Sequence, residues 1–195
     1  SKHRGGDIPT YMRSAAVLEE ALPAAPEHPG LLHYLIHSYD DPAHAPLGMR
    51  AARIYNRVAP EAPHALHMTS HIFIARGMWD EVMAANEQAM RAGSAREAKQ
   101  GRPALVCGHA PEWRVYALLQ TRRSAEARDA IAACGRHALG ALERDHGAKG
   151  HHYRSGAVSY AGMLVREAVE ARQAVDPKAF PKAGAYPGIA FRLAY

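Results

Sequence analysis

Three histidines occur in the short stretch HALHMTSHIF. They are His64, His67 and His71, separated by three and then four positions, and this spacing places all three on one face of an α-helix. An earlier pair, His33 and His37, has the same separation of four. Imidazole nitrogens bind Zn, Cu, Ni and Fe. The histidines therefore predict a face that binds something, with a transition metal as the leading hypothesis.

The first choice of metal ligands is the four histidines that form two i,i+4 pairs, His33 with His37 and His67 with His71. Packed helices lie about 8–10 Å apart, so two facing pairs can converge on one ion at N–metal distances of about 2.0–2.1 Å. A nearby carboxylate could complete the ligand set or orient an imidazole from behind. The second-choice ligands are Asp40, Asp41, His44, His64 and His109.

Two other interpretations of the histidines stay open. They could donate hydrogen bonds to a ligand in a groove, or they could be structural and bond to one another or to backbone carbonyls. Two equal pairs could also reflect duplication alone. No HExxH motif occurs, because Met68 follows His67, and the sequence has no phosphate-binding Gly loop or Ser nucleophile elbow. A binding module is therefore favoured over an enzyme.

The composition favours helices and excludes some partners. The 195 residues carry a net charge of +5 and are 48% hydrophobic. Alanine, leucine and arginine are common, and β-branched runs are rare. Basic residues are spread along the chain, so we expect no nucleic-acid partner. No apolar stretch approaches the roughly 20 residues that span a bilayer, so we expect no membrane segment.

The two cysteines, Cys107 and Cys134, form no CxxC motif and predict no disulfide. Cys107 is expected to be an ordinary buried or surface thiol. Cys134 falls at a small-residue packing position of a helix, where a core role is expected.

Short apolar helices alternate with turns rich in proline and glycine, and no β-hairpin or βαβ pattern appears. When residues 29–60 are shifted forward by 34, several identities coincide. They are Pro29/Pro63, Leu32/Leu66, His33/His67, His37/His71, Met49/Met83, Ala51/Ala85 and Arg57/Arg91. The two histidine pairs therefore occupy equivalent positions of a repeated helix hairpin.

A 34-residue period with two antiparallel helices per unit resembles the tetratricopeptide repeat family, over roughly 60% of the chain. Gly77–x–Trp79 lies where such repeats turn, and RGMWDEVMAANEQAMRA is similar to the usual second helix. A third unit aligns His109 with His64 but has Arg122 in place of the turn glycine. The histidine-rich segment also looks like a bacterial subgroup of this family.

The resemblance implies an all-α fold, a TPR-like α-solenoid of antiparallel helix hairpins. The expected parts are an N-terminal lead-in and helix at 1–28, repeats at 29–62, 63–96 and 108–141, a C-terminal helical region at 142–175 and an irregular tail rich in proline and aromatic residues at 176–195. Because an open solenoid needs caps at its ends, we also expect a homo-oligomer or a larger parent chain.

In this family the first helices line a concave groove that binds extended peptides. The resemblance places the histidines in that groove and adds Glu112, Tyr116 and Gln120 as ligand-contacting candidates. The leading hypothesis is a binding module whose histidine-lined groove holds a Zn, Cu, Ni or Fe ion. The first alternative is a protein–protein interaction scaffold that binds a peptide without a metal. The second is a His-ligated metalloenzyme.

Overall fold

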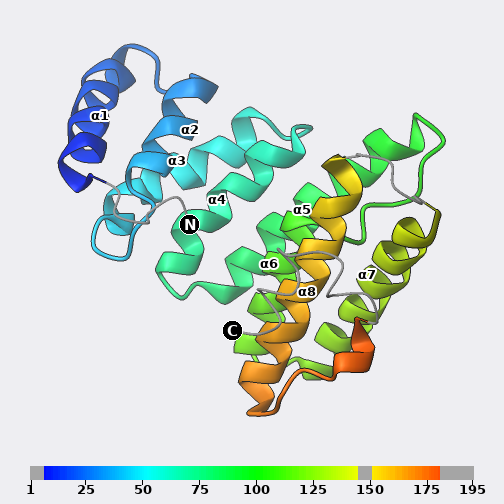
Figure 1. Cartoon of the computed structure of the whole chain (residues 1–195). Helices are drawn as coiled ribbons and strands as arrows, with labels where there is room; N and C mark the ends of the chain where they lie inside the picture. The colour runs from blue at the N-terminus through cyan, green and yellow to red at the C-terminus, as the bar shows by residue number, and fades with distance from the viewer. Residues whose placement is uncertain (1–6, 145–150, 181–195) are drawn as a thin grey trace. The chain divides into compact units, whose positions relative to one another are not determined.

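The computed structural model describes residues 7–144 and 151–180, except for the side chains of residues 142–144, 151–155 and 177. All regular structure in this part of the chain is helical, which confirms the expected all-α class (Figure 1). The elements are α1 (Ile8–Ala21), η1 (Leu22–Ala24), α2 (Pro29–Ser38), α3 (Ala45–Val58), α4 (Pro63–Ala75), α5 (Trp79–Ala98), α6 (His109–Gln120), α7 (Ser124–Arg144), α8 (His151–Ala171) and η2 (Pro177–Ala179). None of the described helices has the length and apolar character needed to cross a bilayer.

Proline sets where the histidine-bearing helices begin. Pro29 and Pro63 occupy the first positions of α2 and α4, where the missing N–H costs nothing and the fixed φ suits a helix. Just before α2, the Nδ1 atom of His28 accepts hydrogen bonds from the N–H groups of Gly30 and Leu31 at 3.1 and 3.3 Å. His28 is therefore a helix cap.

The helix ends show the same turn with different residues. Gly77 after α4 has a φ of 67°, and Arg122 after α6 has a φ of 59°. In both places the next N–H bonds to a carbonyl five residues earlier, at 2.9 and 2.8 Å. This is the Schellman arrangement that usually selects glycine. Arg122 therefore adopts the conformation of the turn glycine that the third unit lacks.

The helix boundaries follow the repeat found in the sequence. α2 and α4 begin 34 positions apart, and so do α3 and α5. α4 and α6 end 45 positions apart, and α5 and α7 begin 45 positions apart, which matches the aligned third unit after its insertion. The hairpin periodicity is therefore present in the backbone as well as in the residue types.

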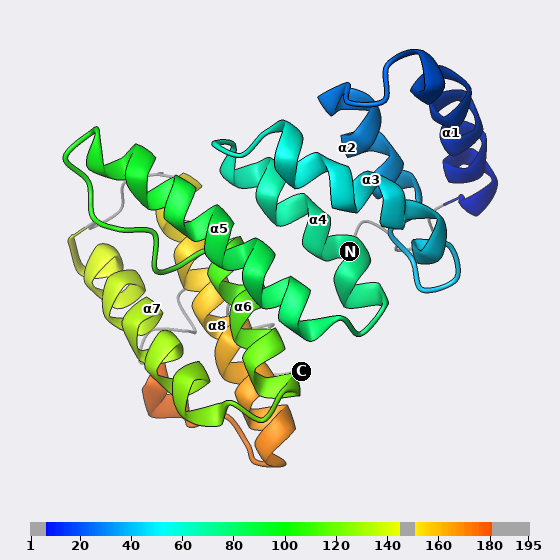
Figure 2. The same cartoon turned by 180° about the vertical axis from the view of Figure 1, so that it is seen from behind.

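The chain divides into two compact units, Ser1–Gly93 and Ser94–Tyr195. In the first unit α2 packs against α1, α3 and α4, and α3 packs against α4 (Figure 2). The apolar side chains of α2 and α4 fill the core between these helices. Six apolar side chains of these two helices are buried: Leu32, Leu35, Ile36, Leu66, Ile72 and Phe73. Their burial leaves the remaining faces of α2 and α4 for the histidines.

In the second unit α6, α7 and α8 pack against one another. Val115, Leu118 and Met163 are fully buried there. Gly135 of α7 permits close approach to α8, because a Cβ at this position would lie 2.8 Å from the ring of Tyr160. A side chain at this position would therefore force the two helices apart or displace the ring.

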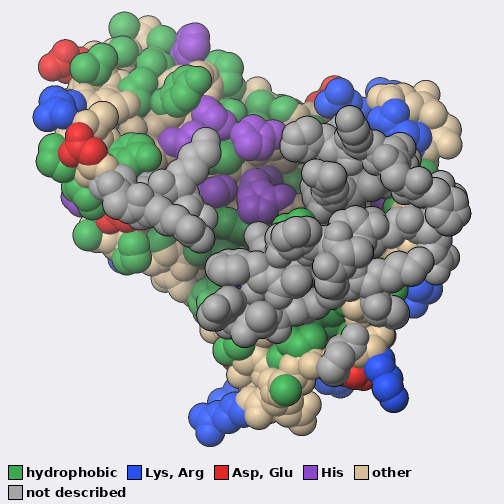
Figure 3. Space-filling view, in the orientation of Figure 1, with side chains coloured by type: hydrophobic (Ala, Val, Ile, Leu, Met, Phe, Trp, Pro, Cys, Tyr) green, Lys and Arg blue, Asp and Glu red, His purple; other side chains and the backbone are tan. Residues whose placement is uncertain are grey.

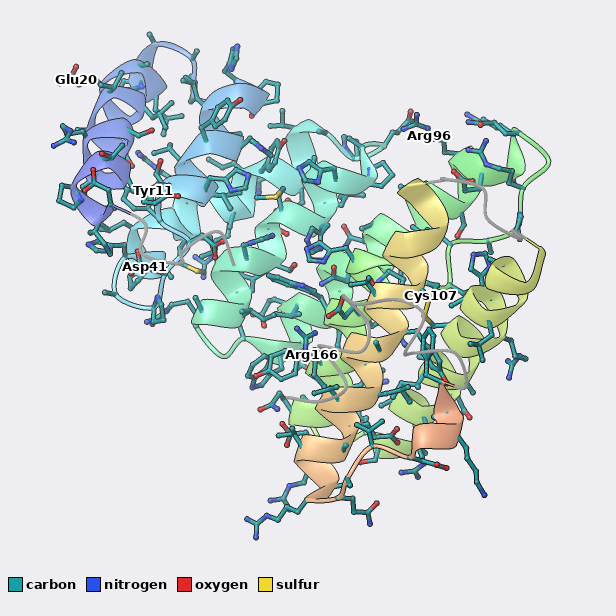
Figure 4. The ribbon with its side chains drawn as sticks, in the orientation of Figure 1. Tyr11, Glu20, Asp41, Arg96, Cys107 and Arg166 are labelled. Atoms are coloured by element: carbon teal, nitrogen blue, oxygen red, sulfur yellow. A yellow bond between two sulfur atoms is a disulfide. The ribbon has the colours of Figure 1, made fainter. Side chains whose placement is uncertain are left out.

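A disulfide joins Cys107 to Cys134, so the expectation of two unpaired cysteines is wrong. Cys107 precedes α6 and Cys134 lies in the middle of α7 (Figure 4). The α6–α7 hairpin brings their Cα atoms to 4.5 Å, within the range that a disulfide spans. The pairing could not be predicted from the 27-residue separation, because it depends on how the hairpin folds back.

Candidate metal centre

Five histidines of the first unit form what we call the histidine cluster. In order of ring contact they are His64, His33, His37, His71 and His67, with successive centroid separations of 5.3, 4.6, 6.2 and 5.2 Å. Histidine side chains gather on the face over α2 and α4 in Figure 3. The contacts cross from α4 to α2 and back, so the cluster belongs to both helices.

The elements explain this placement. Each i,i+4 pair lies on one helix face, one turn apart, and α2 packs directly against α4. The structure therefore brings the four first-choice ligands, His33, His37, His67 and His71, next to one another. It also adds His64, a second-choice ligand, beside His33.

Two rings of the cluster are anchored through Nδ1. The Nδ1 atom of His71 lies 2.8 Å from a carboxylate oxygen of Asp40, and the Nδ1 atom of His67 lies 2.7 Å from the side-chain oxygen of Asn86. The Asn86 amide nitrogen donates to the Val82 carbonyl at 2.8 Å, which assigns its oxygen to the ring. In the neutral imidazole, an Nδ1–H that donates to such an oxygen leaves the lone pair on Nε2. This is how outer oxygens prepare a histidine to bind a metal.

A third ring is also held at Nδ1. The Nδ1 atom of His33 lies 3.3 Å from the hydroxyl of Tyr55 on α3. Burial raises the pKa of Tyr55, so the phenol stays neutral near pH 7. A phenol oxygen can accept the Nδ1–H as well as donate. If the Tyr55 oxygen accepts the Nδ1–H of His33, the Nε2 atom of His33 is presented in the same way as in His67 and His71.

The separation of His67 and His71 suits one shared ion. Two imidazoles on a tetrahedral ion have ring centres about 5.2 Å apart, if N–metal bonds are about 2.1 Å and each ring centre lies about 1.1 Å behind its nitrogen. The observed centroid separation is 5.2 Å. A ring nitrogen of each residue also lies within 4.8 Å of the other. Small side-chain rotations would therefore bring both nitrogens to one ion.

The cluster is not uniformly open to solvent. His67 is only 4% exposed, although the histidines were expected to line an open groove. Asn86 explains this burial, because it supplies the polar partner that a buried imidazole requires. His33, His37 and His71 are half-buried, and His64 is exposed. The cluster therefore runs from a buried ring to a solvent-exposed ring.

Asp41 and His44 bind each other at the turn between α2 and α3 (Figure 4). The Nδ1 atom of His44 lies 2.8 Å from Asp41, which also accepts from the backbone N–H groups of Ala43 and His44. Burial tends to raise the pKa of Asp41, but these hydrogen bonds outweigh it and lower the pKa. The stabilisation is present above the unfolded-state pKa and is lost as the pH falls through the lowered one.

The three ligand-contacting candidates of the second unit have described contacts with α8. Glu112 is 5% exposed and lies 3.5 Å from Nη1 of Arg166. The guanidinium of Arg166, which is labelled in Figure 4, stacks over the ring of Tyr116 at 4.9 Å from its centroid. Gln120 donates to Glu170. The sequence missed these partners, because the fourth helix pair carries only a weak repeat pattern.

His109 begins α6 in the second unit, where its ring contacts Trp113 edge-on at a centroid separation of 5.3 Å.

Two residues of the first unit, Asn86 and Tyr55, anchor cluster histidines but were not predicted from the sequence. Both lie on second helices of hairpins, and Asn86 is a fully buried polar residue. A polar residue on the otherwise apolar face of residues 79–96 was the feature of the sequence that could have indicated an anchoring side chain.

No family model matches the chain, and comparisons with curated proteins and with solved structures find no significant match. The similarity to tetratricopeptide repeats therefore rests on the period and on the matching residues.

Proposed function

We propose that the first unit is a metal-binding module whose ion is held by the Nε2 atoms of His67 and His71. The observation that carries the proposal is the Nδ1 anchoring of both rings, by Asn86 and by Asp40. Rings anchored in this way present Nε2 as the nitrogen available for coordination. Within the first unit, His37, whose ring centre lies 6.2 Å from that of His71, is a candidate for a third ligand.

The two anchors differ in charge, and this difference has a chemical consequence. The carboxylate of Asp40 gives the His71 ring a negatively charged partner, whereas the neutral Asn86 amide mainly fixes the orientation of His67. An all-imidazole set suits Zn, Cu, Ni or Fe. With two or three protein ligands, the ion would keep a coordination position for water or for a bound ligand. That position would allow either capture of a ligand or catalysis.

The helix arrangement supports a TPR-like solenoid as the scaffold of this module. Within the first unit, α2 and α4 are the first helices of successive hairpins and lie side by side. First helices of such repeats line the concave surface, where a peptide would bind in the metal-free alternative. The rigid backing of α3 and α5 would hold the histidines in place, because both helices supply an anchoring side chain.

Metal uptake by the full chain tests the proposal directly. The chain is purified without a polyhistidine tag, incubated separately with Zn²⁺, Cu²⁺, Ni²⁺ and Fe²⁺, desalted, and analysed by elemental mass spectrometry. We expect at least one equivalent of one of these metals to be retained. A His137→Ala variant, altered on α7 of the second unit, is the matched control and should retain the same amount. Retention of none of the four ions would rule out the metal site and leave the peptide-binding alternative.

Removing the carboxylate behind His71 is expected to weaken the site without removing a ligand. Asp40→Asn should lower metal affinity about 10–100-fold, the usual effect of losing an outer partner. Competition against a chelating dye measures this change. Asp41→Asn is the matched control, because Asp41 bonds to His44 rather than to the cluster. Equal affinities in the two variants would contradict the role assigned to Asp40.

A further inference from the structure

We propose that the histidine cluster holds a second metal ion, bound by His33 and His64, so that the first unit takes up two ions. The inference rests on the proposed function at His67 and His71. Its basis is the ring separation of His33 and His64, which is 5.3 Å between centroids. This value is close to the about 5.2 Å expected for two imidazoles that share a tetrahedral ion.

The second pair repeats the anchoring seen in the first. Nδ1 of His33 is held by the hydroxyl of Tyr55, as Nδ1 of His71 is held by Asp40 and Nδ1 of His67 by Asn86. Three cluster histidines, His33, His67 and His71, therefore contact a protein oxygen through Nδ1. The shared pattern favours Nε2 as the coordinating atom at both pairs.

The two pairs lie at different positions along α4. His64 and His71 are seven residues apart on α4, which is about 10.5 Å along the helix axis. Two imidazoles on a single ion have ring centres at most about 6.4 Å apart. His64 and His71 therefore lie about two turns apart on α4, which favours a separate ion at each pair over one ion shared by both. His37 contacts both His33 and His71, at 4.6 and 6.2 Å between centroids, so it could serve either ion.

The charges around the two pairs set the order of binding. The His67–His71 pair has the carboxylate of Asp40 at 2.8 Å from one ring. The His33–His64 pair has the neutral phenol of Tyr55 instead. Because two divalent ions also repel each other, the second ion should bind more weakly than the first.

Zinc titration of the full, untagged chain, followed by native mass spectrometry and by calorimetry, tests the second site. We expect two Zn²⁺ per chain, with the second binding more weakly. His33→Ala combined with His64→Ala should leave one Zn²⁺ bound at the native tighter affinity. Tyr55→Phe keeps the aromatic core and should weaken only the second event. His137→Ala should still bind two.

The outcomes separate this inference from the proposed function. A native chain that binds one Zn²⁺, unchanged by the His33→Ala, His64→Ala double substitution, would refute the second site and leave the first standing. Two ions in that double variant would also refute it, because the second ion would then lie elsewhere. No zinc in the native chain would refute both. Loss of both ions in the double variant would overturn the assignment of separate pairs, provided that its circular dichroism matches the native chain.

Discussion

Replacing His67 and His71 together by alanine is expected to remove the tighter metal-binding event. Each substitution deletes one of the two nitrogens that would hold the ion, and the remaining half-buried rings cannot restore that geometry. The loss should exceed the about 10–100-fold expected for an outer partner such as Asp40. Competition with a chelating dye and elemental analysis measure it. If the second site exists, one weakly bound ion should remain.

The controls for this variant address folding as well as binding. His67 is buried and bonded to Asn86, so its loss also leaves a small cavity and an unsatisfied amide. His71→Ala alone disturbs the core less and should still weaken binding strongly. Thermal melts without metal report the folding change separately. Unchanged metal affinity in a folded double variant would show that the ion is held elsewhere.

Breaking the disulfide between Cys107 and Cys134 is expected to lower the free energy of unfolding by about 3–4 kcal/mol, because the bond closes a loop of 27 residues in the unfolded chain. For a chain of this size the melting temperature should fall by roughly 6–16 °C. Replacement of both cysteines by alanine and reduction of the native chain by a phosphine should agree. Differential scanning calorimetry measures both.

Two comparisons check the source of that effect. The phosphine should leave the melting temperature of the double alanine variant unchanged. Zinc stoichiometry should be the same in native and variant chains, because the proposed ligands lie in the first unit and the disulfide lies in the second. A native chain whose melting is insensitive to reduction would show that the bond does not contribute to stability.

The sequence predicted the parts of the fold that depend on local chemistry. Proline at the start of α2 and α4, and glycine at 77, mark boundaries that the structure confirms. The turn at Arg122 was harder to predict, because arginine, unlike glycine, does not indicate a left-handed backbone conformation. The alignment of the third unit with the second still placed this turn correctly, since that alignment does not require a glycine at the turn.

The partners that anchor the histidines could not be predicted, because they depend on packing. The spacing of His67 and His71 is visible on one helix, whereas the contact of His67 with Asn86 depends on how α5 lies against α4. The salt bridge between Glu112 and Arg166 likewise depends on α8, whose sequence pattern is interrupted by Gly156 and Gly162. Ligand types were therefore easier to predict than the side chains that orient them.

The disulfide also bears on which metal the chain can select. The sequence contains two cysteines in all, and both sulfurs are used in this one covalent bond. The oxidised chain thus offers no thiolate, the ligand that favours soft ions such as Cu(I). Selectivity among metals would then depend on the nitrogen donors and on the affinity order of divalent ions, in which Cu²⁺ stands highest. With its cysteines reduced, the second unit would offer two thiols, a type of ligand that the histidine cluster of the first unit does not contain.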